Sequence, residues 1–563
     1  MNKTTKTGLT GIFAASVIAI ASHEATAALP QLSPATPANI KLSCEQIASN
    51  FTFANTHLTE VISIAAGELT LAKENIPQHC LVTGKMYPRK GIDGKDYAIG
   101  FEMRLPTKWN GRYFYQGNGG IDGSVKTALG ITSGGGPLTG ALMQGFAVIS
   151  SDAGHSSRGP SFGLDPQARL DYGYQAVGKL TPMAKSLIAT AYGKGPDRSY
   201  IGGCSNGGRH TMVAATRYAS DYDGYLIGSP GFNLPQAAVA NIGGAKLYAS
   251  IPGTDLKDLS TAFTGAERAM LVDKILQKCD ALDGVSDGIV QDRNACQSSF
   301  DINRDIASCT AGRDGSCLTI EQKSAIGKIF SGVTTSNGKL IYASFPWDSG
   351  IASPGVQRWE YKIPVQRDSG AVAKIFKTPP APAEGFNGSD FVFNTSIDTM
   401  VTEIWASNAA FTESGMAFMT PQDPTQMGAV KDRGAKILAY HGTSDAIFSL
   451  DDTVAWYEGL SKNNGGDASD FAKLYPVPAM GHCRGGPATD QFDLLTELVA
   501  WVEEGQEPTA VIASARGVGN AGGVNKEVPA NWSATRTRPL CPHPQVARYN
   551  SGDIELASSF SCQ

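Results

Sequence analysis

A Gly-x-Ser-x-Gly pattern between a strand and a helix restricts the fold of this 563-residue chain more than any other feature. It occurs at 203–207, where Ser205 follows the strand-like segment 198–202 and precedes a helical segment. Further matches at 159–163 and 284–288 lie in loops. A sharp turn between a strand and a helix lifts a serine hydroxyl above a sheet, and glycines are needed where side chains would clash. The pattern predicts Ser205 as a nucleophile; the alternative is a serine in an ordinary strand–helix turn.

Strand-like and helical segments alternate in both end regions of the chain. The strand-like segments are 112–116, 145–151, 198–202, 224–228, 436–440 and 472–477, and the helical ones include 183–192, 207–218 and 491–504. This alternation predicts a mostly parallel sheet. Between 233 and 424 it is lost, and cysteines, glycines and prolines gather there. We therefore expect an α/β domain built from 28–232 and 425–563, with 233–424 inserted as a lid.

The first 27 residues have the features of an export signal. Lys3 and Lys6 precede an apolar stretch at 9–21, and Ala25-Thr26-Ala27 is a small-x-small cleavage site. The alternative is a buried N-terminal helix. We expect a secreted or periplasmic protein, and no later stretch reads as a membrane span. The formal net charge is −5 without a basic cluster, so nucleic acid is not an expected partner. The oligomeric state stays open.

Ten cysteines, all after the predicted signal, indicate five disulfides in an exported chain. Cysteine-ligated zinc is the alternative, but no CxxC spacing occurs. Short separations favour pairing Cys279 with Cys296, Cys309 with Cys317 and Cys541 with Cys562, and Cys44 with Cys80 is plausible on the same ground. Cys204 and Cys483 remain, far apart in the sequence.

A serine nucleophile needs a base and an acid, and two loops after late strands offer them. Asp445 follows the strand-like segment 436–440, and His482 follows 472–477. His441 lies at a strand end and is interpreted as packed, and His155 as structural. The pattern places no acid beside the remaining mature-chain histidines, which are His57, His79, His210 and His543.

Together these residues predict acyl transfer. Ser205 would attack an ester carbonyl, His482 would carry the proton, and Asp445 would fix the imidazole tautomer. The backbone N–H groups of Asn206 and Gly120 are the expected oxyanion donors. Such a triad would bring Cys204 and Cys483 close enough for a disulfide; two separate buried thiols are the alternative.

The arrangement Cys-Ser … Asp … His-Cys resembles the tannase and feruloyl esterase family over essentially the whole mature chain. The matching stretches are SYIGGCSNGGR, FGLDPQARLDYGY, CDALDGVSDGIV, YHGTSDAIFS, VPAMGHCRGGPATDQFD and TRPLCPHPQVARY. The resemblance implies an α/β-hydrolase fold with a lid, serine esterase activity on esters of aromatic acids, and the five disulfides proposed above, including Cys204–Cys483. A small aromatic ester is the expected partner, and no organic cofactor is expected.

The segment 280–289 carries three aspartates on a glycine-containing loop. Such oxygen ligands suit Ca²⁺, although the spacing is not that of an EF-hand, and a simply solvated acidic loop is the alternative. The resemblance implies a structural calcium, held by the side chains of Asp280, Asp283 and Asp287 and by the carbonyls of Val285 and Ile289.

Three residues are predicted to bind the substrate. Trp359 and Phe448 could sandwich an aromatic ring, although both could equally be ordinary core. Arg367 is the nearest candidate for holding a free carboxylate, but the segment 359–380 is several residues shorter than the family pattern and no phenylalanine follows at the matching place. The leading expectation is an esterase for phenolic acids such as ferulates or gallates. A monoesterase of terephthalate type is the alternative, and a non-catalytic exported binding module is a third.

Overall fold

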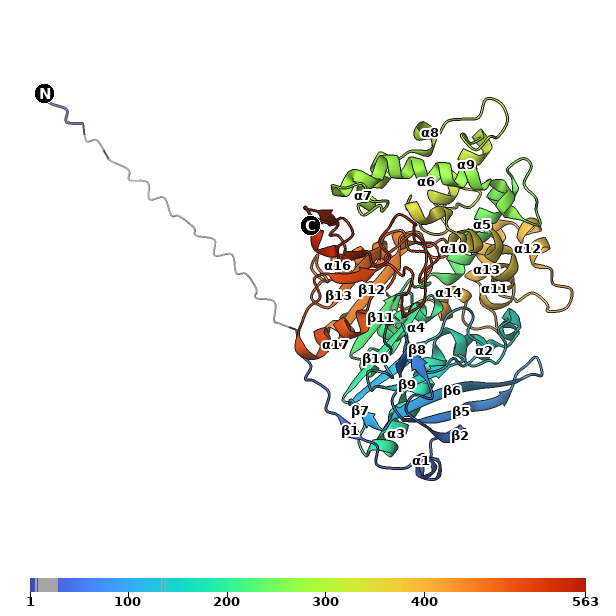
Figure 1. Cartoon of the computed structure of the whole chain (residues 1–563), viewed down its shortest axis with the longest axis vertical. Helices are drawn as coiled ribbons and strands as arrows, with labels where there is room; N and C mark the ends of the chain where they lie inside the picture. The colour runs from blue at the N-terminus through green and yellow to red at the C-terminus, as the bar shows by residue number, and fades with distance from the viewer. Residues whose placement is uncertain (6–7, 9–28, 133, 137) are drawn as a thin grey trace.

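A nine-stranded sheet forms the centre of the computed structural model, which describes residues 1–5, 8, 29–132, 134–136 and 138–563 (Figure 1). The predicted apolar stretch 9–21 and cleavage site 25–27 lie outside the described residues. In spatial order the strands are β13 (Ala472–Val477), β12 (Lys436–Gly442), β11 (Gly224–Gly228), β10 (Arg198–Cys204), β8 (Arg112–Gly117), β9 (Ala147–Ser151), β6 (Asp96–Pro106), β5 (His79–Lys90) and β2 (Thr56–Ile64).

The sheet has a parallel part and an antiparallel part. From β13 to β9 every pair of neighbours is parallel, which is what the strand–helix alternation predicts. From β9 to β2 every pair is antiparallel. This second part was not predicted, because β5 and β6 form a hairpin without an intervening helix. The carboxyl ends of parallel strands share one edge of the sheet, so loops following β8, β10, β12 and β13 gather at that edge.

Helices cover both faces of the parallel part. One hydrophobic cluster contains α3 (Ala176–Tyr192), α4 (Asn206–Arg217) and α16 (Leu450–Asn463), and a second cluster on the opposite face contains α17 (Leu494–Glu504). Neighbouring strand residues alternate between them: Ile201 packs in the first cluster and Tyr200 in the second. Because α3 begins at Ala176 and passes Pro182, it is longer than the predicted helix.

A large helical insertion separates β11 from β12, although these strands are neighbours in the sheet. It has its own hydrophobic cluster and lies over one end of the sheet domain (Figure 1). Its helices are α5 (Leu234–Ala249), α6 (Gly265–Cys279), α7 (Arg293–Ser299), α8 (Ile302–Asp305), α9 (Ile320–Phe330), α10 (Pro354–Gln357), α11 (Ser369–Ala371), α12 (Gly388–Asn394), α13 (Ile397–Ile404), α14 (Gly415–Met419) and α15 (Gly428–Asp432). The predicted α/β fold with a large insertion is therefore confirmed.

Short elements complete the fold at the two ends of the chain. They are β1 (Ala38–Asn39), α1 (Cys44–Asn50), β3 (Thr70–Leu71), β4 (Glu74–Asn75), β7 (Lys108–Trp109), α2 (Pro166–Leu170), β14 (Val511–Ser514), β15 (Thr537–Leu540), β16 (Ala547–Tyr549) and β17 (Phe560–Cys562). Among the described residues, no helix is both long and apolar enough to cross a membrane.

All ten cysteines are paired, so the prediction of five disulfides is confirmed. The pairs are Cys44–Cys80, Cys204–Cys483, Cys279–Cys296, Cys309–Cys317 and Cys541–Cys562. Four of them close short stretches of chain, whereas Cys204–Cys483 spans a sequence separation of 279 and joins the two halves of the sheet domain.

Candidate active site

Ser205 lies at the turn between β10 and α4, as the sequence predicts. Its backbone has φ 67° and ψ −126°, in the left-handed half of the Ramachandran map that non-glycine residues rarely occupy. The loop after β8 packs directly on this turn: a Cβ on Gly117 would lie 2.8 Å from the carbonyl oxygen of Gly207, and one on Gly203 would lie 2.5 Å from that of Gly117. Glycine is therefore required at these positions for the β8 loop to approach the serine.

His482 connects the serine to the acid. Its Nε2 lies 2.7 Å from Ser205 Oγ, and its Nδ1 lies 2.7 Å from Asp445 Oδ2. Asp445 follows β12 and His482 follows β13, so the three groups come from three loops at one edge of the sheet. The structure thus brings together the serine, imidazole and carboxylate that the sequence predicts, at hydrogen-bond distances.

Asp445 is completely buried yet fully hydrogen-bonded. Its Oδ1 accepts bonds from the backbone N–H groups of Ile447 at 3.0 Å and Phe448 at 3.1 Å. Burial by itself raises the pKa of this carboxyl, but the charge on His482 and hydrogen bonds from His441 and His482 outweigh it and hold the pKa well below its usual range. Asp445 is therefore an anion that can orient and stabilise an imidazolium.

The other histidines have different surroundings. His441 is buried, with Nδ1 2.8 Å from Thr453 Oγ1 and Nε2 2.9 Å from the carbonyl of Phe448, and this Nε2 also lies 3.4 Å from Asp445 Oδ2, so His441 packs against the carboxylate. His155 is buried and stacks on Phe162. The sequence pattern placed no acid beside His210 or His543. In the structure, however, acids do lie beside both, since elements distant in sequence bring Asp122 to 3.3 Å from His210 and Glu458 to 3.5 Å from His543.

Of the predicted oxyanion donors, Asn206 directly follows Ser205, and Gly120 follows a glycine that lies beside it. Asn206 is the first residue of α4, where backbone N–H groups have no partner within the helix. The glycine preceding Gly120 lies beside Ser205, since a Cβ on Gly119 would be 3.7 Å from the serine Cβ. Among the loop, cap and side-chain hydrogen bonds of the described residues, none is donated by the backbone N–H of Asn206 or Gly120.

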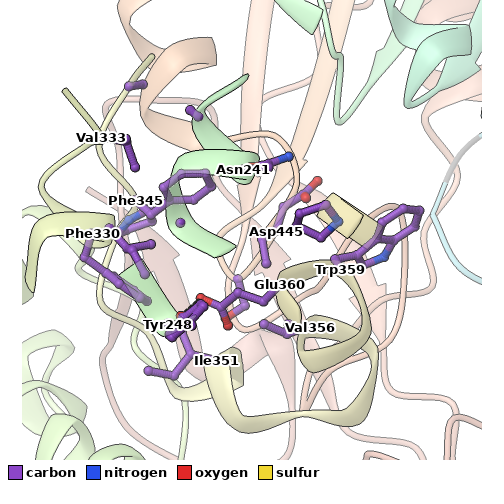
Figure 2. A pocket seen from close by; sticks show the side chains of 18 of the residues that line it. Asn241, Tyr248, Phe330, Val333, Phe345, Ile351, Val356, Trp359, Glu360 and Asp445 are labelled. Atoms are coloured by element: carbon purple, nitrogen blue, oxygen red, sulfur yellow. Dashed lines mark hydrogen bonds between the residues drawn. The ribbon is translucent and has the colours of Figure 1, made fainter. Parts of the chain in front are cut away.

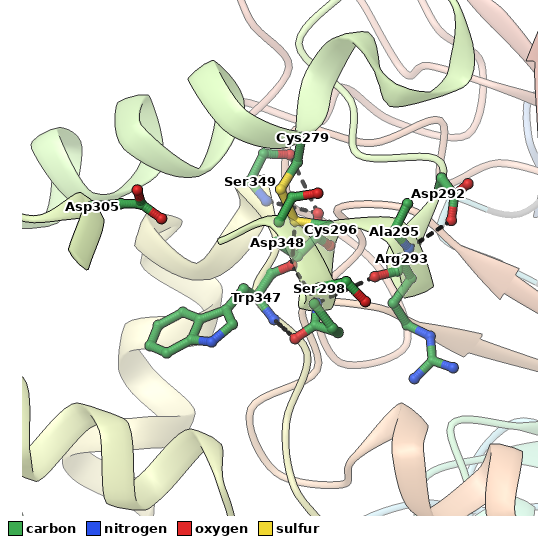
Figure 3. Close-up of a disulfide and its surroundings, with 12 residues drawn as sticks. Cys279, Asp292, Arg293, Ala295, Cys296, Ser298, Asp305, Trp347, Asp348 and Ser349 are labelled. Carbon is green, nitrogen blue, oxygen red and sulfur yellow. Dashed lines mark hydrogen bonds between the residues drawn. A yellow bond between two sulfur atoms is a disulfide. The ribbon is translucent and has the colours of Figure 1, made fainter. Parts of the chain in front are cut away.

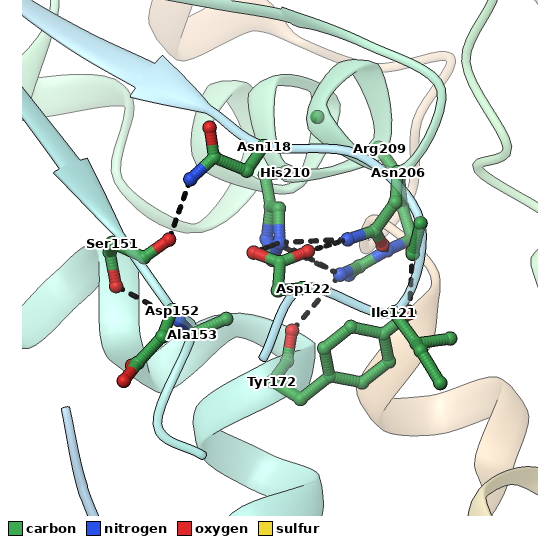
Figure 4. A network of polar contacts seen from close by, with 12 residues as sticks. Asn118, Ile121, Asp122, Ser151, Asp152, Ala153, Tyr172, Asn206, Arg209 and His210 are labelled. Carbon is green, nitrogen blue, oxygen red and sulfur yellow. Dashed lines mark hydrogen bonds and ion pairs between the residues drawn. The ribbon is translucent and has the colours of Figure 1, made fainter. Parts of the chain in front are cut away.

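A buried polar network fixes these donors, and sequence reasoning missed it. The Asn206 side chain donates to Asp122 Oδ1 and accepts from Arg209 Nε at 2.7 Å, while Asp122 Oδ2 faces His210 (Figure 4). Asp122 lies two residues after Gly120, so the network ties the β8 loop to the start of α4. The spacing of Asn206, Arg209 and His210 along one helix face was the available signal; nothing in the sequence pointed to Asp122 as their partner.

Two of the predicted substrate-binding residues flank the imidazole. The ring centroids of Trp359 and Phe448 lie 4.9 Å and 5.4 Å from that of His482, both in edge-to-face orientation. Arg367 lies next to this pair, with its guanidinium carbon 4.8 Å from the centre of the Trp359 ring. Its Nη2 also lies 3.3 Å from Asp368 Oδ1, so part of its charge is matched by that neighbour.

A small cavity of about 40 Å³ lies between the insertion and the loop that carries Asp445. Figure 2 shows Asp445 and Trp359 on one side and Phe330 on the other. Its lining includes several polar residues, among them Glu360, which accepts a hydrogen bond from Tyr248 Oη at 2.5 Å. Burial raises the pKa of Glu360 to about 7, although Tyr248 and Arg268 oppose the shift. No sequence pattern pointed to this pair.

The predicted calcium loop brings its three aspartates near one another. Burial and then the charges of Asp287 and Asp280 raise the pKa of Asp283 to about 7, and Asp283 Oδ2 is buried without a hydrogen-bond partner. Asp280 accepts from the backbone of Asp287 and Gly288, and Asp287 pairs with Arg538. Within the described residues, no group of three or more His, Cys, Asp or Glu side chains converges as a metal site. The unpartnered Asp283 oxygen nevertheless suits a cation.

Comparison of the sequence and the structure with known proteins finds similar esterases and hydrolases. A family model described as tannase and feruloyl esterase matches residues 80–563. The mono(2-hydroxyethyl) terephthalate hydrolase of Piscinibacter sakaiensis is 38% identical over 535 residues, covering 88% of this chain and 87% of that protein. A probable feruloyl esterase B-1 of Neosartorya fischeri is 29% identical over 442 residues, covering 74% and 76%. The crystal structure of feruloyl esterase B from Aspergillus oryzae superposes with a TM-score of 0.73 at 21% identity, covering 92% and 99%.

Proposed function

Because the chain belongs to the tannase and feruloyl esterase family and is a carboxylic ester hydrolase, we propose that it cleaves esters of aromatic acids through Ser205, His482 and Asp445. The observation that carries this proposal is the unbroken chain of two 2.7 Å contacts from Ser205 Oγ through the imidazole to Asp445. A serine hydroxyl is a weak nucleophile, and a hydrogen-bonded base is what activates it.

In the first step, Ser205 Oγ attacks the ester carbonyl while His482 Nε2 takes the hydroxyl proton. The tetrahedral intermediate collapses when the imidazolium returns this proton to the leaving alcohol, which gives an acyl-enzyme. Water, activated by the same imidazole, then attacks the acyl carbon and releases the acid and the free serine. Asp445 keeps the Nδ1 proton facing itself and stabilises the imidazolium.

The oxyanion formed in both steps would be held by the N–H groups of Asn206 and Gly120. A donor of this kind typically contributes about 3 kcal/mol of transition-state stabilisation. The Asp122 network supports this role, because it anchors the two segments that carry the donors to one another. The donors are thus oriented before the substrate arrives.

The aromatic acyl class is supported by Trp359 and Phe448. Both rings lie edge to face with the imidazole, and flat apolar faces favour an aromatic ring in an offset or edge-to-face arrangement. An acyl group seated between them lies beside the base and close to the serine. Phenolic acids of the ferulate or gallate type fit this description, and the printed names of the feruloyl esterase relatives support it.

A second candidate is a monoesterase that takes a terephthalate-type half-ester. The 38% identity to the terephthalate monoester hydrolase and the place of Arg367 beside Trp359 favour it. Asp368 weakens it, because this buried carboxylate already shares the guanidinium. Rates on a free-acid substrate and on its neutral methyl ester separate the two: a strong preference for the free acid would favour the monoesterase, and equal rates would oppose it.

Calcium binding and export are two further proposals for this protein. Asp280, Asp283 and Asp287, with the carbonyls of Val285 and Ile289, would hold a structural Ca²⁺ that offsets the buried charge of Asp283. The ion would stabilise the insertion and take no part in the chemistry. The five disulfides support a secreted or periplasmic location.

The direct test is a rate panel over gallate, ferulate, hydroxybenzoate and terephthalate esters with the wild type and Ser205→Ala. We expect hydrolysis of aromatic-acid esters by the wild type and none by a folded Ser205→Ala variant. Undiminished turnover by that variant would refute the assignment of Ser205. Equal rates of the wild type on aromatic-acid and acetyl esters of the same alcohol would refute the aromatic class.

A further inference from the structure

A buried carboxylate of the insertion touches both loops that carry the proposed acid and base. Asp348 Oδ2 accepts a hydrogen bond from Ser444 Oγ at 2.9 Å and another from Thr443 Oγ1, in the loop after β12. The same oxygen accepts from the backbone N–H of Ala479 at 2.9 Å, in the loop after β13. Ser444 directly precedes Asp445, and Ala479 lies three residues before His482.

The segment around Asp348 is packed tightly against the two loops. Asp348 is 1% exposed, and its other oxygen accepts from the backbone of Ser349 at 2.7 Å. A Cβ on Gly350 would lie 2.4 Å from the carbonyl of Ala479 and 2.5 Å from Ser444 Oγ. The turn after Asp348 therefore fits between the two loops only because residue 350 is glycine.

The two loops need such support. Ala479 has φ 58°, a left-handed conformation that non-glycine residues rarely adopt. Its N–H is held by Asp348 and, at 2.7 Å, by Thr443 Oγ1. One carboxylate therefore stabilises both the strained Ala479, three residues before His482, and Ser444, the residue before Asp445.

A disulfide of the insertion restrains the segment that carries this carboxylate. The backbone N–H of Trp347 donates to Gln297 Oε1 at 3.1 Å, and the carbonyl of Trp347 accepts from Gln297 Nε2 at 3.3 Å. Gln297 follows Cys296, which is bonded to Cys279 (Figure 3). The segment that carries Asp348 is thus fixed to α7 and, through the disulfide, to α6.

We propose that Asp348 is a positioning residue that sets the distance between Asp445 and His482. The inference rests on the proposed function, because it gives the insertion a part in holding the triad as well as in binding substrate. Asp348 would act through Thr443, Ser444 and Ala479 and would not touch the substrate. A buried carboxylate that accepts five hydrogen bonds, the longest at 3.5 Å from Ser349 Oγ, suits this role, because replacing it leaves several donors unsatisfied at once.

The test compares Asp348→Asn with Glu267→Gln. Glu267 is also a fully buried carboxylate of the insertion, but its partners are Arg313, Gln322 and the N-terminus of α6, away from the site. Both variants are measured for Tm, for kcat and KM on an aromatic-acid ester per site titrated with a fluorophosphonate, and for the proton NMR signal of the His482–Asp445 hydrogen bond. Ser444→Ala, which removes a single donor, serves if Asp348→Asn fails to fold.

We expect Asp348→Asn to lower kcat by about 10- to 100-fold, since small misplacements of catalytic groups have effects of this size. KM stays within a factor of about two, since no substrate contact is lost, and the NMR signal shifts or broadens. Ser444→Ala shows the same pattern more weakly, and Glu267→Gln loses Tm alone. An Asp348→Asn enzyme, or in its place a Ser444→Ala enzyme, with a lower Tm but unchanged kcat and NMR signal would overturn the proposal.

Ser205→Ala is assayed in parallel. Activity of this variant would refute the triad itself. An inactive Ser205→Ala variant together with a fully active Asp348→Asn variant would refute only the positioning role of Asp348.

Discussion

Cys204 and Cys483 form a disulfide that joins the residue before Ser205 to the residue after His482. Their Cα atoms lie 6.1 Å apart, so the bond ties the turn that carries Ser205 to the loop that carries His482 at the carboxyl edge of the sheet. Cys483 itself has φ 64°, so the backbone beside the base is held in a conformation that non-glycine residues rarely adopt. A covalent tie at this point restrains the distance between the Ser205 hydroxyl and the His482 imidazole.

Removing this tie should impair catalysis more than removing a remote one. The double variant Cys204→Ala/Cys483→Ala and the control Cys44→Ala/Cys80→Ala are each expected to lose about 2–5 kcal/mol of unfolding free energy. Only the first should lose kcat, by about tenfold or more, at temperatures where both are folded. Denaturant unfolding together with steady-state kinetics provides the comparison. Equal kcat values for the two double variants would show that the disulfide near the site is purely structural.

Replacing Asp445 by asparagine should reverse the imidazole tautomer. The backbone N–H groups of Ile447 and Phe448 donate to Oδ1, so the amide oxygen stays with them and the amide NH₂ turns towards His482 Nδ1. His482 must then carry its proton on Nε2, facing Ser205, and cannot accept the serine proton. We expect kcat to fall by about 10³- to 10⁴-fold, with KM little changed. A kcat within tenfold of the wild type would contradict the assigned role of Asp445.

Trp359→Ala should change specificity. Since the indole borders His482 edge to face, its removal takes away one wall of the proposed acyl site. The ratio of kcat/KM for an aromatic-acid ester over the acetyl ester of the same alcohol should fall by about tenfold, the effect of losing 1.4 kcal/mol of aromatic contact. Trp359→Phe should keep most of the ratio. If Trp359→Ala lowers both rates equally, the indole supports the histidine without selecting the substrate.

Glu360 should make stability fall with rising pH. Burial raises its pKa to about 7, against about 4.3 in an unfolded chain. Between these values the folded protein keeps the proton that the unfolded chain has lost, so the folded state is favoured at the acid end and its advantage disappears as the pH approaches 7. The unfolding free energy of Glu360→Gln relative to the wild type should therefore rise from pH 4.5 to 7.5. Parallel curves for the two proteins across this range would contradict the prediction.

Calcium should stabilise the fold without changing the chemistry. At a free Ca²⁺ concentration a hundred times the Kd, binding adds about 2.7 kcal/mol to the unfolding free energy. Adding Ca²⁺ to chelator-treated protein should raise Tm and leave kcat unchanged where the protein is folded. In Asp283→Asn, Tm should no longer respond. A wild-type Tm that is identical in chelator and in Ca²⁺ would refute the site.

The proposed triad could be located from the sequence because each member follows a strand of one parallel sheet. Ser205, Asp445 and His482 needed only the strand order and the rule that such strands end at a shared edge. The disulfide between Cys204 and Cys483 followed from the same placement. The antiparallel strands β5 and β6 were missed, because a hairpin lacks the strand–helix alternation on which the interpretation relied.

The residues that support the site could not be found in this way. Asp348 reaches Thr443 across a sequence separation of 95, and Asp122 reaches Asn206 across 84. Both come from irregular segments, where no periodic pattern fixes the direction of a side chain. Their partners are set by tertiary packing between distant segments, which local sequence patterns do not reveal.

Trapping the covalent acyl-enzyme intermediate tests most directly whether Ser205 is the nucleophile. The wild type is mixed with an aromatic-acid ester, quenched with acid within one turnover, digested and analysed by mass spectrometry, with Ser205→Ala as the control. We predict an acyl adduct on the peptide that contains Ser205, at the mass of the aromatic acid less water, and no adduct in the variant. An adduct on another residue would contradict Ser205 as the nucleophile. Rapid wild-type hydrolysis with no adduct, under conditions that trap a known serine esterase, would contradict it as well.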